Sequence, residues 1–477
     1  MTSITKEDVE RLVGNHDYLL SFWDELEAEE KIAFHKQLSE LDFNSLDADF
    51  KNTLNIPATG CENLEPVSQE HQESAETLEK STFDSYWKTG LEQISQNKVA
   101  ALVLAGGQAS RLGTIHAKGT VKLDINVAHG DSLLGIQAAK IKILQDAADK
   151  LFGTKSRIEW IIMTSSGTHE ETKEHVKELA SLHGLDQDQI TIFQQRNIPA
   201  FAKDGKYLLA TKSSLVLAPN GNGGLYESLK PLLPELEAKG LEYVHVYCVD
   251  NILCKVADPA FIGFAKTKNA DVVTKIVPKL PGELVGSVCL DAGRPRVVEY
   301  SELGAELANK KTNDGRYLFG AGSIANHLFS MEFLKRVCDG PALPYHVAHK
   351  KIAHYDQTGK LVQPQEPNGI KLEKFVFDVF EHSKNFHMWE VDRHEEFSPL
   401  KNADHVGKDC ITTCRRDLMN LNRKWLSLAG AKISDVPVFV KSSVSYNGEG
   451  LDELNNQHID TTTVEKFTHI LVPYSPN

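Results

Sequence analysis

Residues 99–118 read VAALVLAGGQASRLGTIHAK, and this stretch predicts the centre of the fold. Residues 100–104 form a short apolar run that ends in Ala-Gly-Gly. A run of this length bounded by glycine predicts a strand buried on both faces of a parallel sheet. The glycines Gly106 and Gly107 permit backbone angles that a Cβ forbids and let a ligand approach the main chain. Since Arg111 and Lys118 add two cations beyond bare N–H groups, the stretch predicts a phosphate site.

An ordinary strand-to-loop turn with a surface arginine is the alternative interpretation of this stretch. The stretch is neither a P-loop nor a G-x-G-x-x-G dinucleotide fingerprint. Its order of strand, Gly-Gly, Arg and Lys resembles the signature of nucleotidyltransferases that make nucleotide sugars, L-x-x-G-G-x-G-T-R-L-G-x-x-x-P-K-G. The matching residues are Gly106, Gly107, Arg111, Leu112, Gly113, Lys118 and Gly119. The sequence departs from the signature at Ala109, Ser110 and Ala117, where the signature has glycine, threonine and proline.

Charge and composition exclude several classes of function. The chain of 477 residues has 52 Lys and Arg against 66 Asp and Glu, a net charge of −14, which argues against nucleic acid or anionic membrane as a partner. No apolar run approaches the length of a membrane-spanning helix, and the charged N-terminus lacks the apolar core of a signal peptide. Seven scattered cysteines suggest reduced thiols. We therefore expect a cytoplasmic protein, either a monomer or a homodimer.

Hydrophobic periodicity predicts three regions along the chain. Residues 1–50 show helical spacing of apolar side chains, whereas residues 57–80 are polar and read as a linker or a loose surface segment. After the glycine loop, apolar strand candidates alternate with amphipathic helices, which predicts a parallel sheet with helices on both faces. Ligands of such sheets bind at the carboxyl ends of the strands. The polar residues that follow the predicted strands are therefore site candidates.

Several short segments carry groups that suit a ligand, and each has a plainer interpretation. APNGNGGLY (218–226) is rich in glycine and amides and is otherwise a surface turn. Asp250 and Asn251 end a buried strand, where a carboxylate is costly unless it is paired or binds a metal. The alternative interpretation is that they cap a helix. The segment 297–302, VVEYSE, alternates like a strand and holds Glu299, which suits sugar hydroxyls or a solvated face. In residues 373–380 the aromatic side chains form either core packing or a wall for a sugar, and Lys401 lies in a loop where a surface lysine is ordinary.

Taken together, these segments and others between residues 83 and 451 strongly resemble the eukaryotic UDP-N-acetylglucosamine pyrophosphorylases, within the UDP-sugar pyrophosphorylase family of nucleotidyltransferases. The resemblance implies an α/β fold with a central Rossmann-like mixed sheet and helices on both faces. It also implies a helical N-terminal domain (1–95), a pyrophosphorylase domain (96–395) and a small β-rich C-terminal domain (396–477). The implied reaction joins UTP and N-acetylglucosamine 1-phosphate to give UDP-N-acetylglucosamine and pyrophosphate, with Mg²⁺ or Mn²⁺.

The resemblance also assigns roles to individual residues. Arg111 and Lys118 match the catalytic cations. Asp250 is the carboxylate that we expect near the metal from its own position at the end of a buried strand, not from the resemblance. The residues expected to bind the nucleotide are Gly106, Gly107, Gln195, Gly223 and Lys401. The residues expected to bind the sugar are Asn222, Gly286, Glu299, Tyr300, Ser323, Phe375 and Phe377.

Departures from the family pattern leave three alternatives open. The family has N-A-G-N-I-A-N-H where this chain has GAGSIANH (320–327), so that Ser323 replaces an asparagine that contacts the sugar. The preferred sugar phosphate could then be that of N-acetylgalactosamine or glucose. Residues 120–130 follow the family poorly, which makes Lys122 a rival of Lys118. Ala109 and Ala117 in the phosphate loop allow a nucleotide-sugar-binding homologue with impaired turnover.

Overall fold

The computed structural model describes residues 4–55, 63–125, 130–300 and 302–474, and its contacts divide the chain into two units. The smaller unit comprises Met1–Gly60, Gln195–Leu225 and Pro341–Asp378. The larger unit comprises Cys61–Gln194, Tyr226–Gly340 and Val379–Asn477. Each unit thus gathers segments that lie far apart in the sequence. The domain boundaries expected after residues 95 and 395 stay a prediction.

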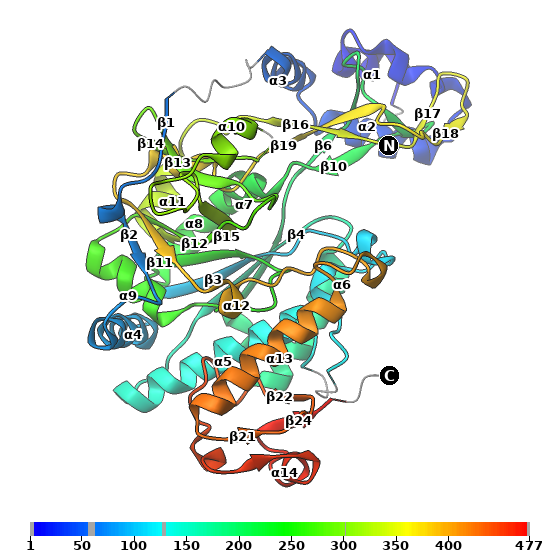
Figure 1. The fold of residues 1–477 in the computed structure, drawn as a ribbon. Helices are drawn as coiled ribbons and strands as arrows, with labels where there is room; N and C mark the ends of the chain where they lie inside the picture. The colour runs from blue at the N-terminus through cyan, green and yellow to red at the C-terminus, as the bar shows by residue number, and fades with distance from the viewer. Residues whose placement is uncertain (1–3, 56–62, 126–129, 301, 475–477) are drawn as a thin grey trace. The chain divides into compact units, whose positions relative to one another are not determined.

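The larger unit is built on an 11-stranded mixed sheet, as the fold class predicted (Figure 1). Its main path runs through β2 (Gln72–Ser74), β20 (Phe386–Glu390), β12 (Val272–Pro278), β15 (Ala321–Ser330), β11 (Tyr243–Cys248), β3 (Val99–Leu104), β4 (Glu159–Thr164) and β5 (Ile190–Gln194). Strands β11, β3, β4 and β5 pair in parallel, whereas β15 is antiparallel to both of its neighbours. Off this path, β13 (Ser287–Asp291) pairs with β1 (Leu64–Glu65), β14 (Arg294–Val298) and β15.

The glycine-bounded run of the sequence is the strand β3, and all six of its residues are buried. Helices cover both faces of the sheet: Figure 1 shows α4 (Lys80–Ser95), α5 (Leu133–Phe152) and α9 (Pro259–Lys268) on one face, and α8 (Leu233–Ala238) and α11 (Met331–Cys338) on the other. Helices α4 and α9 approach closely because of two glycines. A Cβ on Gly90 would lie 1.8 Å from the Pro259 oxygen, and one on Gly263 would lie 1.9 Å from the Tyr86 oxygen.

Two expectations about local structure were wrong in part. Residues 72–74, read as loose surface, form the edge strand β2, which pairs in parallel with β20, and Gln72 Nε2 donates to Glu390 Oε2 at 3.0 Å. An edge strand with polar side chains lacks the apolar pattern that marks a strand in sequence. The strand predicted over 297–302 ends at Val298, because Glu299 and the residues after it leave the ladder with β13. Residues 57–62, also in the expected linker, lie outside the described residues.

In the smaller unit, the N-terminal helices predicted from the sequence pack on short strands. The helices are α1 (Lys6–Val13), α2 (Ala28–Ser39) and α3 (Phe43–Asn55). The strands include β7 (Phe201–Ala202), β16 (His346–Lys350) and β19 (Gly369–Glu373), which form one sheet. The rings of Phe50 and Phe201 stack at 4.6 Å in the common core.

Residues 396–477 group with the larger unit. The helix α13 (Ile411–Leu428) packs on β22 (Val438–Val440), which pairs with β24 (Leu471–Pro473). The Tyr446 hydroxyl donates to the Val256 carbonyl at 3.0 Å and anchors this segment. Over the described residues, no helix combines the length and apolarity needed to cross a membrane.

Candidate active site

The carboxyl ends of the parallel strands gather the candidate groups of the larger unit, as expected for ligand sites of such sheets. Gly106 and Gly107 follow β3, and Asp250 and Asn251 follow β11. Because β15 runs antiparallel to β11, its beginning, with Ser323, lies at the same edge of the sheet.

The glycine loop after β3 closes on itself through the backbone. The Lys118 N–H donates to the Gly107 carbonyl at 3.0 Å, and the Ala109 N–H donates to the His116 carbonyl at 2.9 Å. A Cβ on Gly107 would meet no atom within 4 Å, so this side of the loop is open to a ligand. Gly113, with φ 86°, is the glycine of this described loop that has a positive φ.

The two alanines that depart from the signature fit the loop without strain. Ala109 is buried and has φ −84°, an ordinary angle for any residue. Ala117 has φ −60° and ψ 132°, the angles that proline would adopt. Unlike proline, Ala117 keeps its N–H, which donates to Glu171 Oε2 at 2.7 Å. Neither substitution therefore disturbs the backbone of the loop.

Glu171 of α6 (His169–His183) holds the far end of this loop. Its Oε1 accepts from the Thr120 hydroxyl at 3.0 Å and lies 3.0 Å from His116 Nδ1. Burial raises the pKa of Glu171, but the hydrogen bonds from Ala117 and Thr120 outweigh burial and set the pKa below its ordinary value. This role of Glu171 could not be predicted from the sequence, because a carboxylate in the first turn of a helix carries no sign of a distant partner.

Lys118 and Asp250 meet beyond the glycine loop. Lys118 Nζ lies 3.5 Å from Asp250 Oδ2, and the two side chains are 16% and 20% exposed. Lys401 lies in the same electrostatic environment: burial and Asp250 raise the pKa of the Cys248 thiol to about 12, while Lys401 and Lys118 act on that pKa in the opposite direction. The structure thus brings together two lysines and one carboxylate that the sequence marked separately. Arg111 is exposed on the short helix Ser110–Leu112 of the same loop.

Lys122, the rival of Lys118, lies beside a different set of groups. Burial raises the pKa of Asp131, and Lys122 acts on it in the opposite direction. Lys122 also contributes to the lowered pKa of His175, whose main cause is burial. The backbone of Lys122 bridges that of Ser132 at the start of α5. These neighbours favour Lys118 over Lys122 as the cation that faces Asp250.

The donor set at this edge fits a magnesium ion held mainly by phosphates. No group of three or more His, Cys, Asp or Glu side chains that could hold a metal occurs among the described residues. Asp250 offers a carboxylate close to the loop, on a side chain that is 20% exposed. Mg²⁺ is commonly bound through one or two carboxylates and the substrate phosphates, so one carboxylate suffices for such a site.

The expected sugar-side residues of the larger unit lie around the start of β15. The Ser323 N–H donates to the Gly286 carbonyl at 2.9 Å. A Cβ on Gly286 would lie 2.7 Å from Val297 Cγ1 and 3.6 Å from Glu299 Oε1, so glycine is required by packing and Glu299 is its neighbour. Tyr300 follows and is 44% exposed. Gly286, Glu299 and Ser323 are therefore brought together.

The smaller unit gathers four other expected residues. The Gly223 N–H donates to the Lys374 carbonyl at 2.8 Å, and Asn222 Oδ1 accepts from the Val376 N–H at 2.9 Å. A Cβ on Gly223 would lie 2.7 Å from backbone atoms of Lys374 and Phe375, which explains the glycines of APNGNGG. The rings of Phe375 and Phe377 lie 5.2 Å apart beside this turn. The two segments thus form one surface of amides and aromatic rings.

Gln195, also in the smaller unit, carries an unused acceptor. Its side chain is 8% exposed, and its Oε1 is buried without a hydrogen-bond partner among the described residues. A buried acceptor left unsatisfied is costly, and in native structures it often marks the place of a ligand or water.

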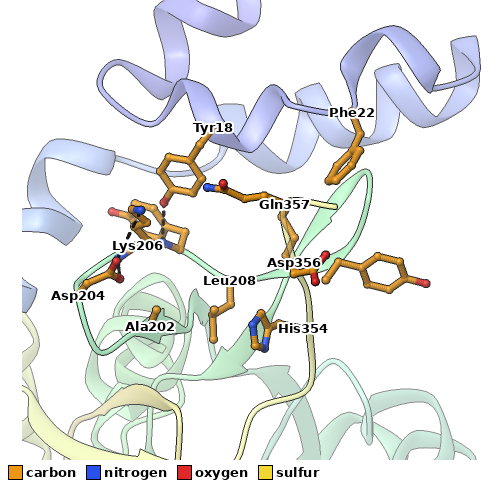
Figure 2. A pocket seen from close by; sticks show the side chains of 12 residues that line it. Tyr18, Phe22, Ala202, Asp204, Lys206, Leu208, His354, Asp356 and Gln357 are labelled. Atoms are coloured by element: carbon orange, nitrogen blue, oxygen red, sulfur yellow. Dashed lines mark hydrogen bonds and ion pairs between the residues drawn. The ribbon is translucent and has the colours of Figure 1, made fainter. Parts of the chain in front are cut away.

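A cavity of about 230 Å³ in the smaller unit is lined by aromatic side chains such as Tyr18, Phe22 and Tyr355 (Figure 2). Several polar groups in its lining already have hydrogen-bond partners. The Tyr18 hydroxyl accepts from the Tyr207 N–H at 2.7 Å, and Asp356 accepts from the N–H groups of Thr358 and Lys360. None of the site residues expected from the sequence lines this cavity.

Comparisons with known proteins identify relatives over nearly the whole chain. The family model described as UTP--glucose-1-phosphate uridylyltransferase matches residues 43–459. A "Probable UDP-N-acetylglucosamine pyrophosphorylase" of Caenorhabditis elegans is 54% identical over 98% of this chain and 97% of that protein. The "UDP-N-acetylglucosamine pyrophosphorylase" of Saccharomyces cerevisiae is 42% identical over 80% of this chain and 81% of that protein.

Solved structures agree with these sequence relatives. The uridine diphosphate N-acetylglucosamine pyrophosphorylase of Trypanosoma brucei superposes with a TM-score of 0.81 at 28% identity and covers 95% of each chain. A putative UDP-N-acetylglucosamine pyrophosphorylase of Entamoeba histolytica superposes with a TM-score of 0.76 at 35% identity and covers 83% of this chain and 98% of its own.

Proposed function

The chain belongs to the UTP--glucose-1-phosphate uridylyltransferase family, and among its members to the UDP-N-acetylglucosamine pyrophosphorylases, so we propose that it joins UTP and N-acetylglucosamine 1-phosphate to give UDP-N-acetylglucosamine and pyrophosphate. The observation that carries the proposal is the meeting of Lys118 and Asp250 at the open end of the glycine loop. Fixed cations beside exposed loop N–H groups suit a polyphosphate substrate.

The proposed reaction is an in-line displacement at the α-phosphorus of UTP. A phosphate oxygen of the sugar phosphate forms the new P–O bond, and the bond to the bridging oxygen of the leaving pyrophosphate breaks. Such a transfer needs alignment and charge neutralisation rather than a protein nucleophile. We assign Arg111 and Lys118 to offset the charge that grows on the α-phosphoryl group and on pyrophosphate.

We propose that Asp250 helps to hold Mg²⁺, or Mn²⁺, on the phosphates. Bound there, the ion would neutralise phosphate charge and fix the orientation of the polyphosphate. Lys118, as the partner of Asp250, holds this carboxylate in place beside the loop.

The other candidate residues are assigned to parts of the two substrates. Gly106 and Gly107 would lie against the nucleotide phosphates, and Lys401 would contact the diphosphate. Gln195 would use its unsatisfied Oε1 to accept from the uracil N–H. The residues proposed for the nucleotide–sugar boundary and the sugar are Asn222, Gly223, Gly286, Glu299, Tyr300, Ser323, Phe375 and Phe377.

A broader choice of sugar is the second candidate function, and Ser323 favours it. Its hydroxyl reaches less far than the asparagine amide of the family pattern, so a sugar hydroxyl at this position is read less strictly. The phosphates of N-acetylgalactosamine and glucose are therefore alternative substrates. An impaired homologue is disfavoured, because Ala109 and Ala117 fit the loop in ordinary backbone conformations.

We place this reaction in the cytoplasm, in keeping with the free thiols of Cys248, Cys254, Cys338, Cys410 and Cys414. The assignment applies to a monomer and to a homodimer alike, since one chain carries every residue named. The acidic net charge argues against nucleic acid or anionic membrane as a partner.

The proposal is tested by measuring pyrophosphate release from UTP and Mg²⁺ with three sugar 1-phosphates in parallel. N-acetylglucosamine 1-phosphate should be consumed, and phosphorus NMR should identify the product as a UDP-sugar. Pyrophosphate release that is equal with and without any sugar phosphate would indicate a UTP hydrolase and refute the proposal.

A further inference from the structure

Lys401 lies in a loop, yet the segment that precedes it is fixed to the strand end that carries Asp250. The Leu400 N–H donates to the Asp250 carbonyl at 2.8 Å, and the Ile252 N–H donates to the Ser398 carbonyl at 3.2 Å. These bonds pair the residues after β11 with the residues before Lys401. The position of Lys401 relative to Asp250 therefore depends on this pairing.

The Asn251 side chain lies at the centre of the pairing and bonds in both directions. Its Nδ2 donates to the Glu396 carbonyl at 2.7 Å, and its Oδ1 accepts from the Ser398 N–H at 2.9 Å. The side chain is 5% exposed, so neither bond is readily replaced by water. An amide is the only side-chain group of this size that donates and accepts in this way. The Asn251 side chain thus satisfies one backbone acceptor and one backbone donor of this segment, as the backbone of a paired strand would.

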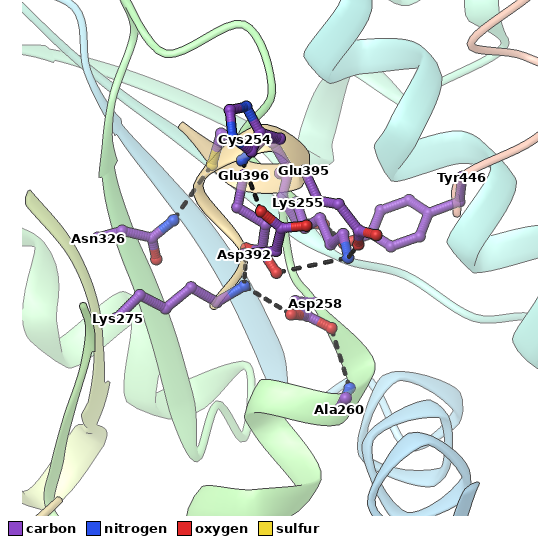
Figure 3. Close-up of polar contacts among 12 residues, drawn as sticks. Cys254, Lys255, Asp258, Ala260, Lys275, Asn326, Asp392, Glu395, Glu396 and Tyr446 are labelled. Carbon is purple, nitrogen blue, oxygen red and sulfur yellow. Dashed lines mark hydrogen bonds and ion pairs between the residues drawn. The ribbon is translucent and has the colours of Figure 1, made fainter. Parts of the chain in front are cut away.

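A buried ion cluster fixes the start of the same segment (Figure 3). The Lys275 ammonium, with no exposed surface, lies 2.6 Å from Asp258 and 2.5 Å from Glu396. Lys255 lies 3.4 Å from the other oxygen of Glu396. Breaking a buried ion pair leaves an uncompensated charge, which is strongly unfavourable, so Glu396 has little freedom to move. Because Asn251 bonds to the backbone of both Glu396 and Ser398, it holds Ser398 at a fixed position relative to Glu396.

We propose that Asn251 is a positioning residue that sets the Lys401 ammonium toward the phosphate group faced by Lys118 and Asp250. The inference rests on the proposed function, since it gives Lys401 a phosphate to contact. A misplacement of about 1 Å at a reacting centre can cost 10²-fold in rate, so a buried hydrogen-bond pair is a reasonable device for holding a loop lysine.

The test is a double-mutant cycle between Asn251→Ala and Lys401→Ala. Both single variants should lower kcat/KM for UTP by about 10-fold or more, and the double variant should be no worse than Lys401→Ala, because residues that act through one another are not additive. The same cycle is measured on the affinity for pyrophosphate by calorimetry. Effects that multiply in both measurements would overturn the proposal.

Asn422→Ala is the matched control. Asn422 is 1% exposed, and its Oδ1 accepts from the Val440 N–H at 3.0 Å. Asn422→Ala should therefore lower the melting temperature by about as much as Asn251→Ala does, but its effect should be additive with that of Lys401→Ala. If Asn251→Ala does not fold, Asn251→Asp serves instead, since it still accepts from Ser398 but cannot donate to Glu396.

The two measurements separate this inference from the proposed function. A wild-type protein that makes no UDP-sugar, but whose pyrophosphate affinity shows the non-additive cycle, would refute the function and retain the positioning role. A wild-type protein that makes UDP-N-acetylglucosamine with an additive cycle would retain the function and refute the role of Asn251.

Discussion

The Ala117 N–H donates to Glu171 Oε2 at 2.7 Å, and this bond takes the place of a proline. The nucleotidyltransferase signature has proline at this position, where the ring fixes φ near −65°. Ala117 reaches φ −60° without a ring and is held by a carboxylate from α6. The residue after it, Lys118, is the proposed catalytic cation. The bond therefore fixes the backbone position from which the Lys118 side chain extends.

Glu171→Gln should therefore loosen the loop. The amide keeps one acceptor and loses the other, so Thr120, His116 or Ala117 is left without its partner. We expect kcat/KM to fall by about 10-fold, the equivalent of one or two net hydrogen bonds. Adding Ala117→Pro should restore most of the activity, because proline sets φ without an acceptor. Glu170→Gln is the control, since Glu170 is 77% exposed, and a double variant no better than Glu171→Gln would contradict the account.

Metal dependence is the second prediction. Activity should be lost in excess chelator and return with Mg²⁺, because in the proposed site the metal ion, held by one carboxylate, neutralises phosphate charge together with two or three cationic side chains. Asp250→Asn should raise the Mg²⁺ concentration needed for half-maximal rate by about 10-fold. Equal turnover with and without chelator would remove the metal from the reaction.

Ser323 should influence the choice of sugar. Ser323→Asn extends the side chain by an amide that both donates and accepts, so we expect the ratio of kcat/KM between the N-acetylglucosamine and N-acetylgalactosamine phosphates to shift by about 1 kcal/mol, the worth of one net hydrogen bond. Both sugars are measured side by side with the same enzyme preparation. An unchanged ratio would place Ser323 outside the sugar site.

Two buried histidines should make the fold sensitive to acid. Burial lowers the pKa of His245 and of His327 to about 3, against 6.5 for the exposed group. Between pH 6.5 and about 3, each of these histidines is protonated in the unfolded chain but neutral in the folded protein. The free energy of unfolding therefore decreases by about 1.4 kcal/mol per histidine for each unit by which the pH is lowered.

Melting temperatures at pH 7, 6, 5 and 4 test this prediction. His327→Phe fits beside Phe329 and Phe380, whose rings lie 5.9 and 5.0 Å from that of His327. The variant loses the contact with Thr274 and should melt lower at pH 7, but its melting temperature should fall less steeply with acid. His349→Gln, at an exposed position, should keep the slope of the wild type. A slope unchanged in His327→Phe would show that another group governs acid unfolding.

The sequence predicted those features that arise within short segments. The apolar run before Gly106 and Gly107 identified β3, and apolar periodicity predicted that amphipathic helices alternate with the strands that follow. The alternation of strands and helices then placed Asp250 and the glycine loop at one edge of the sheet. Each of these inferences needs only local pattern and the rule that parallel strands end together.

Features that depend on distant partners could not be predicted in the same way. The polar segment with Gln72 carries no apolar pattern, and it becomes a strand because β20 offers an edge. Nothing near Glu171 or Asn251 in the sequence indicates which backbone groups they bind. The composition of the smaller unit, with segments from three parts of the chain, likewise follows from tertiary contacts.

The most direct test of the central claim compares Lys118→Ala with Lys122→Ala in the synthesis of UDP-N-acetylglucosamine from UTP and N-acetylglucosamine 1-phosphate. Because Lys118 faces Asp250 and Lys122 lies beside Asp131, we predict that kcat falls by about 10² or more in Lys118→Ala and stays close to that of the wild type in Lys122→Ala. Near-normal turnover in Lys118→Ala, or inactivity confined to Lys122→Ala, would contradict the account.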